Sequence, residues 1–216
     1  MKKLYIVSLI TLCSAIIAGC SEDSHQEIEI TRDRIFRATI ESPDITKTVI
    51  GESTGENSRK VLWLSNDELA VVGESGFRVS RFITLDADSS ETASFEGEIE
   101  DADNYFALYP YSERVSYENN KFRFYLPTVQ SYKAGSFETA TFPMVSKIGG
   151  EDNTLNFQNL CGVLALNLKG EETISSITFS GKGADGNHMV VSGPFTVDMG
   201  YEEFPTMTYA LEPNKT

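Results

Sequence analysis

The feature that most constrains the fold is a succession of short β-prone runs without helical periodicity. Runs rich in Val, Ile, Thr, Phe and Tyr recur at roughly 8–12-residue spacing, with turn signals such as Asn119-Asn120 and Gly149-Gly150 between them. Apolar residues never recur at i, i+3, i+4 and i+7 over three turns. The pattern predicts an all-β chain folded as an antiparallel β-sandwich.

Twelve segments are expected to be strands, and the polar stretch 41–60 is expected to be a loop. Alternation is clearest at 105–109 and 121–126. The expected strands are residues 34–40, 61–63, 68–72, 77–85, 92–98, 105–109, 121–126, 163–168, 174–179, 189–191, 195–199 and 207–211.

The first twenty residues have the three parts of a secretory leader that ends in a lipidation site. Lys2 and Lys3 precede an apolar run over 4–18, and the small Gly19 precedes Cys20. A transmembrane anchor is the alternative, but the run is shorter than the ~20 residues that span a bilayer. A plain signal peptide is the second alternative. We expect cleavage after Gly19 and a lipid on Cys20, so that the membrane contact is the lipid.

The mature chain is expected to be strongly acidic and outside the cytoplasm. Without the two leader lysines, 16 basic side chains remain against 32 acidic ones. This charge disfavours binding to nucleic acid. Residues 20–27 are interpreted as an acidic tether. The run Cys20-Ser21-Glu22-Asp23 is similar to the signal that sends lipoproteins of Bacteroidetes to the outer face of the outer membrane.

The chain holds little that predicts chemistry. Residues 181–186 spell G-x-G-x-x-G, but a strand-like segment follows where a dinucleotide site needs a helix, so a hairpin with Asp185-Gly186 at its turn is expected. Cys161 is expected to be a small buried side chain. G-x-S-x-G, H-E-x-x-H and C-x-x-C do not occur. We therefore expect no enzyme, no catalytic residue, no cofactor and no metal site, with weak calcium binding near Asp86 or Asp101 as an open alternative.

A cluster of aromatic residues has two interpretations. On a surface such rings would stack on sugars, whereas in alternating strands they more often form a core. The core is the favoured interpretation. The residues are Tyr105, Phe106, Tyr109, Tyr111, Tyr117, Phe122, Phe124 and Tyr125.

The order of several short motifs resembles the fimbrillin-like lipoproteins of Bacteroidetes, the subunits of type V pili. The resemblance covers about 34–199, and it depends on the order of the motifs rather than on any one of them. They are Trp63-x-x-Asn66-Asp67, Ala93 to Gly97, Tyr105 to Tyr111, Leu126-Pro127-x-x-Gln130, Pro143-Met144-Val145, Phe157 to Leu164, Ile174 to Gly181 and Ser192-Gly193.

The resemblance implies a transthyretin-like β-sandwich and a second β domain. It divides the chain into a signal peptide (1–19), a tether (20–27), a sandwich (28–200) and a segment 201–216 that is either its last strand or the start of a second, truncated domain. It further implies that an arginine-specific protease removes the first strand, whose groove then accepts a donor strand from another pilus subunit. Arg32, Arg34 and Arg37 are the candidate cleavage points, and Arg37 would release the longest strand. Alternatively, they are ordinary charges beside a strand.

The implied protein is a lipid-anchored, outer-membrane surface component of a fimbrium, with a stalk, tip, anchor or accessory role. Without cleavage it would act as an anchor. The alternative function is a surface lipoprotein that binds glycans. A host or bacterial surface ligand is left open.

Overall fold

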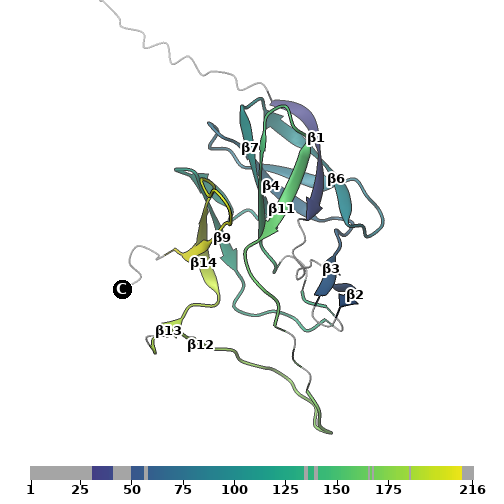
Figure 1. Ribbon diagram of the computed structural model, residues 1–216, viewed down its shortest axis with the longest axis vertical. Coiled ribbons are helices and arrows are strands. Elements are labelled where there is room, and N and C mark those ends of the chain that lie inside the picture. The colour runs from purple at the N-terminus through teal and green to yellow at the C-terminus, as the bar shows by residue number, and fades with distance from the viewer. Residues whose placement is uncertain are drawn as a thin grey trace, which may run out of the picture.

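The described residues form strands, turns and loops and contain no helix. The computed structural model describes residues 31–40, 50–55, 58–133, 136–138, 141–164, 166, 168–184 and 186–210. Figure 1 shows two groups of strands and a long extension below them. The expected all-β class is therefore confirmed for this part of the chain. A search of the same residues found no apolar helix of membrane-spanning length.

Seven strands close into a barrel. The last strand in the spatial order pairs with the first. Every neighbouring pair is antiparallel except the pair of β1 with β11, which is parallel. In that order the strands are β1 (Thr31–Ile40), β11 (Thr154–Asn159), β10 (Met144–Gly149), β7 (Asn104–Tyr109), β4 (Glu68–Gly73), β5 (Ser80–Thr84) and β6 (Thr92–Glu100).

A four-stranded antiparallel sheet lies against one wall of this barrel (Figure 1). Two hairpins complete the secondary structure. The sheet has the order β15 (Met207–Tyr209), β14 (Gly193–Asp198), β9 (Lys121–Leu126) and β8 (Ser116–Glu118); the hairpins pair β2 (Ile50–Gly55) with β3 (Ser58–Val61) and β12 (Gly181–Lys182) with β13 (His188–Met189).

The inside of the barrel is an aromatic core centred on Trp63. Its ring meets Phe95, Tyr109 and Phe157 edge-on, at centroid distances of 5.2, 5.4 and 5.3 Å. Edge-to-face pairs of this kind each contribute about 0.5–1.5 kcal/mol beyond the area they bury. Asp67 holds the turn that follows Trp63. Its carboxylate accepts hydrogen bonds from Leu64 N–H and from the Tyr109 hydroxyl. The Trp63-x-x-Asn66-Asp67 motif is thus part of the barrel core.

A second core lies between the barrel wall and the four-stranded sheet. Strands β4, β7 and β10 are buried on both faces, so that Tyr105 points into the barrel while Phe106 packs under the sheet. Phe122, Phe124 and Phe195 close this core from the sheet side. The aromatic cluster is therefore mostly core: six of its members are buried, Tyr111 is half-buried and Tyr125 is exposed.

The described strands differ from the expected arrangement in three ways. The sheet that contains β1 closes on itself instead of ending at free edges, and β1 and β11 run parallel. The expected loop 41–60 contains β2 and most of β3. The described residues of the expected strands 163–168 and 174–179 belong to no sheet.

The described residues of the glycine-rich run 181–186 belong to a hairpin, as expected, and Asp185 lies outside the described residues. Strand β12 pairs with β13 in antiparallel register, and Gly186 has a φ of +79°, which glycine adopts without strain. Gly186 N–H donates to the carbonyl of Gly183 across the turn. A strand follows the loop instead of a helix, so the phosphate-binding geometry of a dinucleotide fold does not form.

Candidate functional site: the first strand and its arginines

Strand β1 is bonded along both of its edges. Against β6 it runs antiparallel from Thr31 opposite Glu100 to Thr39 opposite Thr92. Against β11 it runs parallel, from Arg37 opposite Thr154 to Ile40 opposite Phe157. It therefore forms the single strand through which the barrel closes between β6 and β11.

The inward face of β1 fills the barrel with one large and one small side chain. Phe36 and Ala38 are both fully buried. The Phe36 ring lies 5.3 Å from that of Phe82 and 5.4 Å from that of Tyr105. The outward face carries Ile35, which is 50% exposed. This strand, which its β-prone composition predicted, thus has one buried and one exposed face.

Arg34 is held in place by the turn between β10 and β11. Its guanidinium donates to the Tyr105 hydroxyl at 2.9 Å, to the carbonyls of Gly150 and Asp152, and to Asn153 Oδ1 at 3.2 Å. The same group lies 4.4 Å from the centre of the Tyr105 ring, a cation–π distance. Arg34 therefore fastens the start of β1 to a loop more than a hundred positions later.

The two other arginines of β1 lie in solvent. Arg37 is exposed, and its side-chain contact is a 3.5 Å approach to Thr92 Oγ1. Arg32 pairs with Asp101 at 2.9 Å, with both side chains more than 60% exposed. Exposed ion pairs of this kind contribute little to stability. Arg32 and Arg37 are thus accessible to a protease pocket, whereas Arg34 must first lose its hydrogen bonds.

Cys20 and the leader lie outside the described residues. Of the other groups that the sequence singled out, Cys161 is half-buried against the barrel core, and burial raises the pKa of its thiol to about 12. A thiol in this state is a poor nucleophile at neutral pH. No cluster of three or more His, Cys, Asp or Glu side chains suited to a metal ion occurs among the described residues.

A cleft at one end of the four-stranded sheet was not foreseen from the sequence. It has a volume of about 660 Å³ and is lined by Arg114, Arg123, Tyr125, Tyr209 and Thr128, among others. The Arg114 guanidinium lies 5.4 Å from the centre of the Tyr125 ring. The residues come from separate parts of the chain, and Arg114 and Thr128 lie outside the strands, so no local pattern in the sequence brings them together.

Comparison of the chain with protein-family models, with curated proteins and with solved structures gave no match.

Proposed function

We propose that this chain is a cell-surface lipoprotein, anchored in the outer membrane through a lipid on Cys20, and a structural, anchor or accessory subunit of a fimbrium of the type V pilus class. The role is not catalytic. Subunits join by β-strand exchange after an arginine-specific protease has removed the first strand. The observation that carries the proposal is β1 itself. It is the first described strand and it follows the expected tether. Loss of its residues up to Arg37 would leave an unpaired edge on β6 and an apolar slot.

Such a slot is costly, and this cost favours the capture of a partner strand. Loss of β1 would leave Phe82 and Tyr105 without the ring of Phe36. A cut after Arg37 would also leave the backbone groups of β6 that face Thr31–Arg37 without partners, whereas Ala38–Ile40 would stay paired with β11. An extended segment from another subunit replaces both kinds of contact at once.

We further propose that the fold is a variant of the transthyretin-like sandwich. The support is the second core, in which the four-stranded sheet faces the wall β4–β7–β10 across a layer of apolar side chains. In a sandwich the two inner faces pack in the same way.

Among the three arginines we propose Arg37 as the cleavage point. Its side chain is exposed, whereas that of Arg34 is bound by four acceptors. The test is digestion of the full chain with an arginine-specific protease and mass spectrometry of the released fragments. Arg37→Lys, which keeps the charge, is expected to prevent release of β1, and Arg32→Lys is expected to leave it unchanged. A cut that persists in Arg37→Lys would contradict the assignment.

The lipid anchor has its own test. Metabolic labelling with palmitate should mark the wild-type protein and leave Cys20→Ser unmarked. The variant should also leave the membrane fraction. Labelling that survives the substitution would remove the basis for the surface location.

Glycan binding is the second candidate, and the cleft favours it. Tyr125 and Tyr209 offer partly exposed rings, and Arg114 offers a cation beside them. Aromatic rings with an arginine would suit a sugar that carries a carboxylate. Binding on a glycan array that is lost in Tyr125→Ala and Arg114→Ala would support this function, and an array without signal would contradict it.

A further inference from the structure

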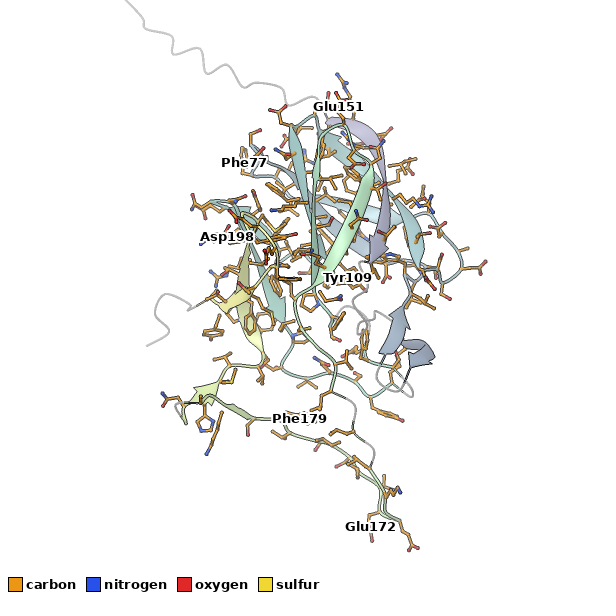
Figure 2. All side chains as sticks on the ribbon, in the orientation of Figure 1. Phe77, Tyr109, Glu151, Glu172, Phe179 and Asp198 are labelled. Carbon is orange, nitrogen blue, oxygen red and sulfur yellow. The ribbon has the colours of Figure 1, made fainter. Side chains whose placement is uncertain are left out.

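The described residues between 162 and 192 form an extended arm that projects from the body of the protein. It leaves the end of β11, runs out to Glu172, and returns past Phe179 to the β12–β13 hairpin and β14 (Figure 2). Of the 19 large apolar side chains exposed in the described residues, 10 lie on this arm. They are Val163, Leu164, Leu166, Leu168, Ile174, Ile177, Phe179, Met189, Val190 and Val191.

So much apolar surface on one segment indicates a binding partner. Leu164 is 70% exposed, and Ile174, Ile177 and Phe179 are each about half exposed. Exposed apolar groups that gather in one place mark interaction sites in soluble proteins. Between Gly170 and Ser180 the backbone also belongs to no sheet. The arm therefore offers both apolar side chains and free strand edges.

The returning half of the arm has the side-chain pattern of β1. In an extended chain Ile177, Phe179 and Gly181 lie on one face, and Ser176, Thr178 and Ser180 on the other. On β1 the inward face has Arg34, Phe36 and Ala38. Both segments thus present a long side chain, a phenylalanine and a small residue at successive inward positions.

We propose that the arm of one copy donates Ile174–Ser180 to the slot that Thr31–Arg37 vacates in a second copy. This inference rests on the proposed strand exchange and names its donor. Phe179 takes the place of Phe36 between Phe82 and Tyr105, and Ile177 takes that of Arg34. Gly181 then reaches the cut end at Ala38 and brings no side chain against it.

The occupant is a second copy because the arm and the slot of one molecule lie apart. In Figure 1 the arm projects beyond the lower end of the barrel, and the Thr31 end of β1 lies at the upper end. The exposed positions of the slot also suit the donor. Ile35 and Arg37, which point outward, are replaced by Thr178 and Ser180, which tolerate solvent.

Two labelled peptides test the donor. One covers the released part of β1 (residues 31–37) and the other the arm (residues 172–182). Binding to the full chain is measured by fluorescence anisotropy before and after cleavage and removal of residues 31–37. Both peptides are expected to bind the cleaved protein and neither the intact one. Phe179→Asp in the arm peptide should weaken binding at least 100-fold. Thr178→Asp, at the exposed position of Ile35, should change it less than threefold.

The outcomes separate the two proposals. If the β1 peptide binds the cleaved protein and the arm peptide does not, the donor assignment is overturned and strand exchange stands. If neither peptide binds, both proposals fall. If Phe179→Asp and Thr178→Asp weaken binding of the arm peptide equally, the donor assignment is also overturned. Such a result would mean that the slot does not distinguish the inward face of the peptide from the outward face.

A disulfide tests the register in the whole protein. Arg37 lies opposite Ser94 in the β1–β6 ladder, so Ser180 of a donor should lie opposite Ser94 of its acceptor. The native cysteines are first replaced. The double variant Ser180→Cys with Ser94→Cys is then expected to form disulfide-linked dimers and higher oligomers after cleavage. The matched pair Ser180→Cys with Ser116→Cys, placed on the other sheet, should stay monomeric. Equal cross-linking of both pairs would refute the register.

Discussion

Truncation of Phe36 measures how firmly β1 is built into the barrel. The side chain is fully buried and contacts two aromatic rings at 5.3 and 5.4 Å. Phe→Ala substitutions in cores cost about 3–5 kcal/mol, and loss of two ring pairs places this site in the upper half of that range. With an m-value of about 2.5 kcal/mol/M in urea, Phe36→Ala should lower the unfolding midpoint by about 1.5–2 M.

The matched control is the next residue along the same strand. Ile35 is 50% exposed on the outer face, so Ile35→Ala should cost less than about 1 kcal/mol. Fluorescence of the single tryptophan, Trp63, reports unfolding because its ring is in the barrel core. Equal shifts for the two variants would mean that β1 is not part of the cooperative core. Removal of β1 would then not leave an apolar slot in the barrel.

Four further predictions concern the barrel and its surroundings. Asp67→Ala should destabilise the protein by about 2–4 kcal/mol in urea unfolding, because it strips partners from a buried tyrosine hydroxyl and from Leu64 N–H. Burial raises the pKa of Asp67 above its usual 3.8. The folded state therefore binds the Asp67 proton more tightly than the unfolded state does. Lowering the pH from 7 towards 4 should raise the free energy of unfolding of the wild type relative to that of Asp67→Asn. Cys161, with a pKa of about 12, should react with a disulfide reagent at pH 8 far more slowly in the folded protein than in urea, and equal rates would contradict its burial. Gly150→Ala would place a Cβ 2.1 Å from a facing carbonyl oxygen and should lower Tm by several degrees. Gly149→Ala, whose Cβ would have nothing within 4 Å, should lower Tm much less. Similar Tm values for the two variants would refute the close approach at Gly150.

Local patterns predicted some of the strands that have one exposed and one buried face, such as β9, and missed others, such as β11. The bounds of β9 match the prediction at 121–126 because its side chains alternate between the second core and solvent. The asparagines that precede it adopt positive φ, as a tight hairpin turn requires. For such elements the sequence pattern is sufficient, because burial itself has a period of two.

Of the three strands buried on both faces, β4 and β7 were expected at 68–72 and 105–109, whereas β10 escaped the prediction. In β10, Met144 enters the barrel core and Val145 the second core, so no alternation marks the strand. The closure of the barrel and the capture of Arg34 by residues 150–153 escaped it for another reason. Both depend on pairing between distant segments, which no local window of sequence encodes.

The parallel contact of β1 with β11 also constrains the time course of folding. Thr39 bonds to Asn156, 117 positions later in the chain. Joining such distant segments requires a large loop to close first, which slows folding. In a chain synthesised amino end first, the β11 edge of β1 therefore stays unpaired until residues 154–157 have been made. Until then Phe36 lacks part of the barrel wall that buries it, so the last contact to form is the one that closes the barrel.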